Sequence, residues 1–323
     1  MTDRGHQTVT AFAPATVANV ACGFDVLGFA LSAPGDEIVA TRRRAPGVVI
    51  DGITGDGGRL PRDAARNTAG VAAQALLDAA RSGDGVSIVL HKGLPLSSGL
   101  GGSAASAVAA VVAVDALLGL GASTDLLLQC ALAGERLASG STHPDNVAPA
   151  LLGGFVLARS AVPPDLVRLP VPDGLACAIV HPHLEVETAA ARRLLGDTVP
   201  LQAAIRQWAN LGGLVAGLFR SDFALIGRSL EDVVAEPKRS ALVPGFAAMK
   251  QAALDAGALG CSLSGSGPSL FALCRTADEA ARVAGAMREA LERAEGIASD
   301  TWVSPVGQEG ARVMRTSDTA CAS

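Results

Sequence analysis

The feature that most constrains the fold is one long apolar stretch, Ala104–Ala122, built mainly of Ala, Val, Leu and Gly. It contains a single charged residue, Asp115. A helix that is apolar on every side either crosses a membrane or lies buried inside a globular core. This stretch is rich in Ala and Gly, and no basic or aromatic anchors flank it. We therefore predict a buried core helix and no membrane span.

A glycine-rich loop directly precedes this helix and contains Gly99, Gly101 and Gly102. Glycine lets the backbone turn sharply and bring its N–H groups close to a ligand. The free N–H groups and positive dipole end of the helix would face this loop, which favours phosphate binding. The Ser103 hydroxyl at the junction could ligate magnesium. An ordinary tight turn would give the same local pattern, so the loop alone leaves both interpretations open.

The loop differs from two familiar phosphate-binding loops. A P-loop requires Gly-Lys-Ser/Thr, and none of the three lysines follows a glycine. The relaxed Rossmann fingerprint fits Gly99–Ala104, but the expected strand, Val86–Leu90, ends eight residues before it. No strand ending in an acidic residue is expected ~20 residues further on. The segment therefore indicates a third kind of phosphate loop.

Composition excludes several classes of function. The net charge is −5 and the longest basic run is Arg42–Arg44, so a nucleic-acid-binding surface is not expected. Aromatic residues are only 3% of the chain, so Ala, Val and Leu must fill the core. The six cysteines form no C-x-x-C pair, and the N-terminus lacks the apolar segment of a signal peptide. These features predict reduced thiols and a cytoplasmic protein.

Strands and helices mix without regular alternation, which predicts the α+β class. Val48–Asp51 is expected to form a hairpin with the strand Glu37–Arg43. Prolines 163, 164, 170 and 172 indicate a domain boundary near residue 160. We predict domains over 1–160 and 161–309, followed by a mobile tail over 310–323. Other elements are expected as strands at 9–12, 154–158, 175–180, 269–274 and 297–304, and as helices at 67–80, 124–137, 188–195, 201–219, 222–230, 245–256 and 278–293.

Three further segments carry polar or glycine residues of interest, each with a structural alternative. Asn19 and Asp25 lie in an apolar stretch, where a carboxylate needs a partner, although Asp25 could simply cap a turn. Glu135, near the end of a predicted helix, suits magnesium beside phosphates, although it could be a solvated side chain. The glycines at 265 and 267 allow a second close backbone approach, or a glycine-rich hairpin.

Together, the four segments resemble the GHMP kinases. The family pattern P-x-x-x-G-L-G-S-S-A-A is similar to Pro95–Ala105, with Gly102 in place of the first serine. Within the family, the resemblance is closest to the homoserine kinases and spans about residues 8–305. It rests further on Ala18–Gly28, His143–Gly154 and Glu236–Gly245.

This resemblance implies ATP-dependent phosphorylation of the L-homoserine hydroxyl, on the route to threonine. It implies an N-terminal domain like ribosomal protein S5 domain 2 and a ferredoxin-like C-terminal domain. It is compatible with a homodimer but does not require one. Another GHMP kinase of small alcohols, such as a mevalonate or threonine kinase, and a catalytically inactive paralogue are the alternatives.

The resemblance also assigns site residues. Ser103 and Glu135 would hold Mg²⁺ and, with Asn146, form the catalytic set. Asn146 stands where some relatives have a basic aspartate, so the proton would pass to the phosphate or to the adjacent Asp145. The residues implied to contact ATP are Asn67, Pro95, Ser98, Gly99, Leu100, Gly101, Gly102, Ser103 and Gly265. The residues implied to contact the amino acid are Asn19, Asp25, Asn146, Thr188, Arg192 and Arg239.

Overall fold

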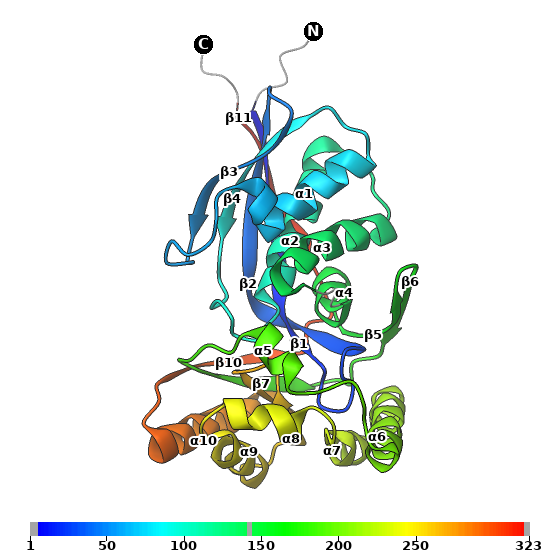
Figure 1. The fold of residues 1–323 in the computed structure, drawn as a ribbon, viewed down its shortest axis with the longest axis vertical. Coiled ribbons are helices and arrows are strands. Elements are labelled where there is room, and N and C mark those ends of the chain that lie inside the picture. The colour runs from blue at the N-terminus through cyan, green and yellow to red at the C-terminus, as the bar shows by residue number, and fades with distance from the viewer. Residues whose placement is uncertain (1–5, 141–143, 320–323) are drawn as a thin grey trace.

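The computed structural model describes residues 6–140 and 144–319, which form two α+β units stacked along the long axis of the molecule (Figure 1). The first unit holds strands β1 (His6–Ala18), β2 (Leu27–Arg43), β3 (Gly47–Thr54), β4 (Gly85–His91), β5 (Phe155–Ala161) and β6 (Pro164–Leu169), with helices η1 (Ala64–Arg66), α1 (Thr68–Ala79), α2 (Gly102–Leu118), α3 (Thr124–Ser139) and α4 (Pro144–Leu152). The second holds strands β7 (Ala176–Pro182), β8 (Gly260–Leu263), β9 (Leu270–Cys274) and β10 (Ser299–Pro305), with helices α5 (Thr188–Arg193), α6 (Leu201–Arg220), α7 (Phe223–Ser229), α8 (Glu236–Arg239), η2 (Ser240–Leu242), α9 (Phe246–Asp255) and α10 (Ala277–Glu295). The last strand, β11 (Arg312–Thr319), returns to the first unit.

The predicted core helix is confirmed as α2. It lies between the β1–β2 part of the sheet and helices α1 and α3 (Figure 1). Its side chains from 104 to 114 are buried or half-buried on every side. Gly119, with a φ of 64°, ends it in the left-handed conformation that glycine adopts without strain. Within residues 6–140 and 144–319, no helix is long and apolar enough to cross a membrane.

The seven-stranded sheet contradicts one predicted pairing. Its strand order is β11-β1-β2-β4-β3, with the β5–β6 hairpin attached to β2. β3 was expected to form a hairpin with β2, but it pairs in parallel with β4, which lies between the two. Helix α1 connects β3 to β4 as a crossover, which allows β4 to insert there. A strand has the same local pattern in either arrangement, so the sequence could not distinguish them.

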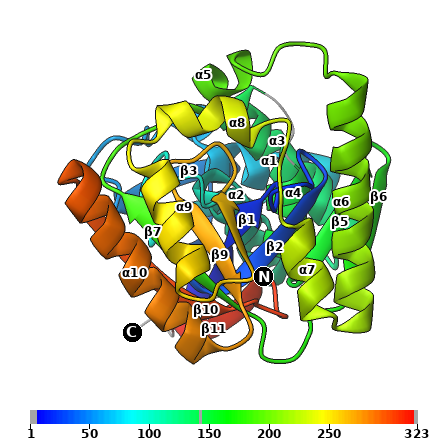
Figure 2. The ribbon, with the colours of Figure 1, turned by 90° about the horizontal axis from the view of Figure 1, so that it is seen from below.

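The second sheet has the order β10-β7-β9-β8, all antiparallel, which is the 4-1-3-2 order of a ferredoxin-like fold. Helices α9 and α10 cover one face of this sheet (Figure 2). Successive β7 side chains alternate between two cores: Ala178 and Val180 face these helices, whereas Cys177 and Ile179 join the core of the first unit. Both faces of β7 are therefore buried. The apolar side chains on one face pack against the core of the first unit, and this packing joins the two units.

The chain end also differs from the prediction. Residues 310–323 were expected to be a mobile tail, but Arg312–Thr319 form β11 and pair antiparallel with β1. Most of the side chains of β11 are exposed, so the strand has no apolar periodicity and is held by backbone hydrogen bonds.

The predicted domain boundary at residue 160 falls inside the β5–β6 hairpin, and the first sheet continues to Leu169. Aromatic contacts connect the two units. The ring centroid of Phe29 lies 4.8 Å from that of Phe155 and 6.1 Å from that of Phe271, which belongs to the second unit.

Candidate active site

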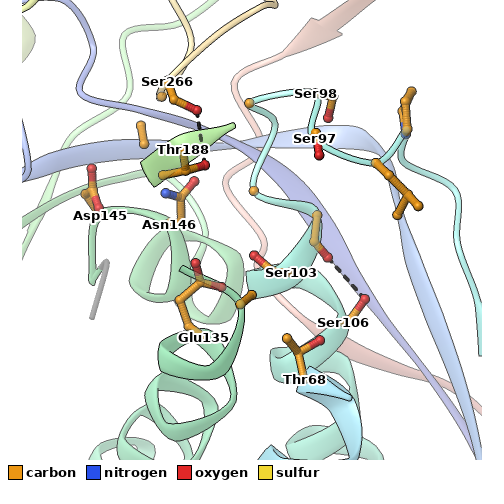
Figure 3. Close-up of a pocket in the computed structure, with 18 of the residues that line it drawn as sticks. Thr68, Ser97, Ser98, Ser103, Ser106, Glu135, Asp145, Asn146, Thr188 and Ser266 are labelled. Atoms are coloured by element: carbon orange, nitrogen blue, oxygen red, sulfur yellow. Dashed lines mark hydrogen bonds between the residues drawn. The ribbon is translucent and has the colours of Figure 1, made fainter. Parts of the chain in front are cut away.

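A cavity of about 370 Å³ lies between the two units and brings together most of the predicted site residues. Its volume lies in the range typical of sites for small molecules. The glycine loop and the start of α2 line it, together with the C-terminal part of α3 and the first turn of α4. Residues of α5, α8 and the second glycine loop come from the other unit. Figure 3 shows Ser103, Glu135 and Asn146 projecting from three helices toward the same space.

The carbonyls of the glycine loop are held by donors on β1 and on the loop between β8 and β9. The carbonyls of Ser98, Gly99 and Leu100 each accept a hydrogen bond from the surrounding protein. The donors are the Ser269 N–H (3.2 Å), the Ser264 hydroxyl (2.7 Å) and the Thr16 N–H (3.1 Å). In a trans peptide, the carbonyl and the following N–H point in opposite directions. The N–H groups of residues 99–101 therefore point away from these donors, and we call this part of the loop the cradle.

Two positions of this loop require glycine, because each has a positive φ and a neighbouring atom that leaves no room for a Cβ. A Cβ at Gly99 (φ 77°) would lie 2.5 Å from the Ser264 carbonyl oxygen of the second glycine loop. A Cβ at Gly101 (φ 66°) would lie 2.0 Å from the Thr16 hydroxyl. That hydroxyl donates to Asn146 Oδ1 at 2.8 Å. The loop thus packs directly against both the C-terminal unit and the Asn146 amide, which fixes the cradle relative to both.

A buried ion pair supports the first turn of α2 and was not predicted. Lys92 Nζ contacts Asp36 and also donates to the Gly102 carbonyl (2.8 Å) and to Ser106 Oγ (3.1 Å). The Lys92 side chain is 3% exposed and that of Asp36 is fully buried. Lys92 also lines the cavity, so this ion pair connects the first turn of α2 to the cavity wall. The two partners are 56 residues apart, so no local motif could have revealed them.

The acidic side of the cavity holds Glu135 and Asp145. Glu135 is 4% exposed and Asp145 is 2% exposed. Burial, followed by the negative charge of Asp25, raises the pKa of Asp145 to about 7. Asp145 is thus poised to change charge near neutral pH, as carboxyl groups in active sites often are.

Two arginines approach the cavity over the ring of Phe24. The guanidinium of Arg192 lies 5.8 Å from the ring centroid and pairs with Asp25, with Nη1 3.2 Å from Oδ1. The guanidinium of Arg239 lies 5.1 Å from the ring and donates to the Gly265 carbonyl at 3.1 Å. Arg239 is only 4% exposed, and burial lowers its pKa. Among the residues that the structure describes, no carboxylate lies within ion-pair distance of Arg239.

Comparison with known proteins identifies the family. The family model described as GHMP kinases N terminal domain matches residues 67–154, and that of the GHMP kinases C terminal matches residues 214–293. The chain is 51% identical to the homoserine kinase of Chlorobium phaeobacteroides, covering 95% of this chain and all of that protein. The chain belongs to the GHMP kinase family. The homoserine kinase of Chlorobaculum tepidum is 50% identical, over 96% of this chain and 99% of that protein.

Solved structures agree with this GHMP kinase assignment. The crystal structure of homoserine kinase from Cytophaga hutchinsonii superposes with a TM-score of 0.92 at 52% identity, covering 95% of this chain and 97% of that one. The mevalonate kinase of L. major shares the fold with a TM-score of 0.71 at 19% identity, over 94% of this chain and 98% of that one. The predicted α+β fold of the GHMP kinases is confirmed.

Two residues predicted to contact the nucleotide, Asn67 and Leu100, are not among the described residues that line the cavity. Asn67 lies outside the described residues that line the cavity, and its side chain caps α1 by accepting from the Ala69 N–H at 3.0 Å. Leu100 is fully buried in the core, so only its backbone can face a ligand. Asn19 lines the cavity. Its amide nitrogen donates to the Gly265 carbonyl (2.8 Å), and its amide oxygen accepts from the Asp25 N–H (3.0 Å).

The structure also adds residues that sequence reasoning missed. Arg59 lines the cavity and pairs with Glu185 across the two units, with Nη2 2.9 Å from Oε2. Ser266 lines it as well, 3.3 Å from the predicted Thr188 hydroxyl. The sequence could have indicated Ser266, because it lies between the two glycines of the second loop. Arg59 follows two glycines in a segment for which no role was predicted.

Proposed function

We propose that this chain phosphorylates the hydroxyl of L-homoserine with ATP, giving O-phospho-L-homoserine and ADP. The curated homoserine kinases at 50–52% identity over nearly their whole length support this function. The charge pattern of the cavity supports it independently. Asp25 and Asp145 supply negative charge beside Arg192 and Arg239, and this arrangement suits a ligand that carries both an ammonium and a carboxylate.

The observation that carries the proposal is Arg239. A buried guanidinium without a carboxylate partner has lost hydration that its carbonyl contacts only partly replace. A substrate carboxylate would complete it through two parallel hydrogen bonds, the geometry that a guanidinium favours. The Asp25 carboxylate, which the structure pairs with Arg192, is the candidate partner of the substrate ammonium. These two contacts would fix the amino-acid end and leave the hydroxyl free to reach the phosphate.

The nucleotide phosphates would rest on the N–H groups of the glycine loop. The Ser103 hydroxyl, at the start of α2, and the Glu135 carboxylate, from α3, both line the cavity, and hard oxygen donors of this kind suit Mg²⁺. Ser103 and Glu135 would supply two oxygen ligands, and oxygens of ATP would supply others. Bound Mg²⁺ would offset the charge on the transferring phosphoryl group.

In the reaction, the homoserine oxygen forms a bond to the γ-phosphorus while the bond from that phosphorus to ADP breaks. The amide of Asn146 cannot accept the hydroxyl proton, so we assign it to positioning, through its bond from Thr16. Two acceptors of the proton are present, the phosphoryl oxygens themselves and the Asp145 carboxylate, whose pKa is about 7. Rate enhancement then comes mainly from alignment and charge.

A coupled assay of ADP release tests the function. Purified protein is given ATP and Mg²⁺ with homoserine, threonine, mevalonate or no acceptor. We expect ADP release with homoserine at a kcat/KM at least about tenfold above that of the other acceptors, and mass spectrometry should find O-phosphohomoserine. Faster turnover with threonine or mevalonate identifies another small-alcohol kinase, and no turnover with any acceptor identifies an inactive paralogue.

A further inference from the structure

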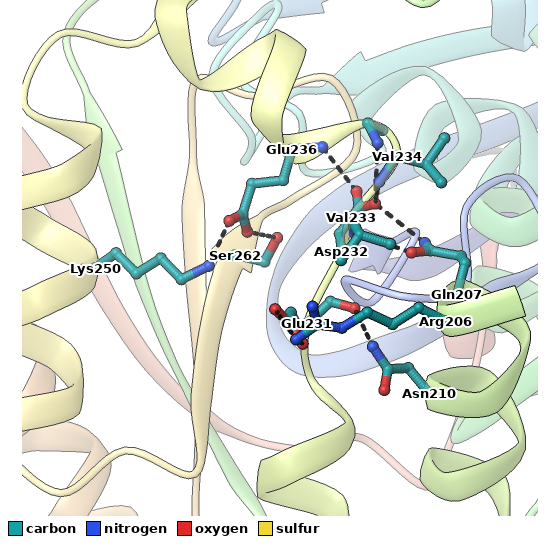
Figure 4. Close-up of polar contacts among 11 residues, drawn as sticks. Arg206, Gln207, Asn210, Glu231, Asp232, Val233, Val234, Glu236, Lys250 and Ser262 are labelled. Carbon is teal, nitrogen blue, oxygen red and sulfur yellow. Dashed lines mark hydrogen bonds and ion pairs between the residues drawn. The ribbon is translucent and has the colours of Figure 1, made fainter. Parts of the chain in front are cut away.

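The short helix α8, which carries Arg239, is held by polar contacts outside the cavity (Figure 4). At its first residue, the Glu236 carboxylate accepts from Ser262 Oγ at 2.6 Å and pairs with Lys250. At its other end, the Arg239 N–H donates to the Ala235 carbonyl at 3.0 Å. A helix of one turn has little stability of its own. The position of Arg239 therefore depends on the residues that fix this turn.

Asp232 fixes the segment that leads into α8. Its Oδ1 accepts from the N–H groups of Val234 (2.8 Å) and Ala235 (2.9 Å), and its Oδ2 accepts from the Glu236 N–H (2.9 Å). Asp232 is 7% exposed, and a buried carboxylate is stable when several donors surround it. Three successive donors are thus turned toward one carboxylate, and this sets the direction in which α8 begins.

Gln207 of α6 connects this segment to the opposite side of the site. Its Oε1 accepts from the Val233 N–H at 3.0 Å, and its Nε2 donates to Asp232 Oδ1 at 3.1 Å. The same Nε2 donates to the Cys22 carbonyl at 3.1 Å. Cys22 lies in the loop between β1 and β2 that carries Asn19 and Asp25. One buried amide therefore contacts both the turn before Arg239 and the loop that presents Asp25.

We propose that Gln207 is a positioning residue for the amino-acid substrate, because it sets the spacing between Asp25 and Arg239. The inference rests on the proposed function and extends it. Gln207 is not among the described residues that line the cavity, so it acts through the two groups it joins. The ammonium and carboxylate of an α-amino acid are a fixed distance apart, so small changes in this spacing weaken both contacts. The partners of Gln207 in these bonds are Cys22, Asp232 and Val233, and none of them belongs to the glycine loop of residues 98–103.

Kinetic constants for the two substrates test this inference. Gln207→Leu removes both donations and the acceptance from Val233. We expect KM for homoserine to rise about tenfold, while KM for ATP stays within about twofold. Asn210→Ala is the matched control: it lies one turn later on α6 and donates to the Glu231 carbonyl at 3.0 Å. It should lower the melting temperature while leaving both KM values within about twofold.

A purely structural role predicts a different result. Partial unfolding lowers the amount of active enzyme and hence the apparent kcat, but it leaves both KM values unchanged. An unchanged homoserine KM in Gln207→Leu, or equal rises for homoserine and ATP, overturns the inference. If Gln207→Leu does not fold, Gln207→Asn keeps a buried amide that is one methylene too short, and the same selective rise is required of it. A wild-type protein without homoserine turnover defeats the proposed function instead, which separates the two failures.

Discussion

Replacing Arg239 with methionine should separate activity from stability. The guanidinium donates to the Gly265 carbonyl (3.1 Å) and to the Ala191 carbonyl (3.4 Å). Gly265 also accepts from the Asn19 amide at 2.8 Å, so it keeps a partner when the arginine is removed. The ring of Phe24 would then contact the methionine side chain. The ligand-free protein therefore loses little when this cation is replaced.

The two expected effects have opposite signs. Burial lowers the pKa of Arg239, which reflects the unfavourable desolvation of its charge in the folded protein. Replacing a buried charge with an apolar side chain of similar size is often neutral or stabilising. Truncating a desolvated contact to a substrate carboxylate costs ~2–5 kcal/mol, equivalent to a loss of about 30-fold or more in kcat/KM. We expect Arg239→Met to keep or raise the melting temperature while losing at least this much activity.

The assay combines thermal unfolding without ligands and steady-state kinetics with homoserine and ATP. KM for ATP should stay within about twofold, and Arg239→Lys should fall between wild type and Arg239→Met, because ammonium keeps the charge but not the paired donors. Arg206→Met is the control, since Arg206 is 61% exposed and its ion pair with Glu231 contributes ~0–1 kcal/mol. A loss of less than about threefold in homoserine kcat/KM for Arg239→Met refutes the carboxylate contact.

Three further predictions follow from the same site. Ser103→Ala and Glu135→Gln should each lower kcat far more than they raise KM for homoserine at saturating Mg²⁺; near wild-type kcat in either variant contradicts the metal assignment. Gly101→Ala should abolish activity, because its φ is 66° and the added Cβ would lie 2.0 Å from a hydroxyl oxygen. Gly102→Ser should keep activity within a few-fold, because its Cβ would lie 3.3 Å from Lys92 Nζ and 3.6 Å from Leu94 Cβ; equal losses in the two variants contradict the loop geometry. Because the pKa of Asp145 is about 7 when folded, the folded state binds its proton more tightly than the unfolded state between pH ~4 and 7, so the stability of the ligand-free protein should fall as pH rises through that window. Asp145→Asn should remove this decline and be more stable than wild type at pH 8; parallel melting curves of the two proteins against pH contradict the assignment.

The sequence by itself determined the elements whose signals are local. The apolar stretch after Gly102, without basic or aromatic anchors, predicted a buried helix, and α2 is one. The glycine loop before it was compatible with a phosphate site, because backbone conformation and helix dipole depend on neighbouring residues, but an ordinary tight turn fitted the same pattern. Resemblance to the GHMP kinases brought in Glu135, Asn146 and Arg239, which lie in three separate segments.

Only the tertiary structure decided which segments meet. The parallel pairing of β3 with β4 and the return of β11 to β1 depend on backbone bonds between distant strands. The Lys92–Asp36 pair joins residues 56 positions apart, and Gln207 contacts Cys22 across 185 positions. Such partners leave no periodicity or spacing in the chain, because their chemistry depends on proximity in space and not along the backbone. Resemblance had already assigned Arg239, but only the tertiary structure showed that it is buried and lacks a carboxylate neighbour among the described residues.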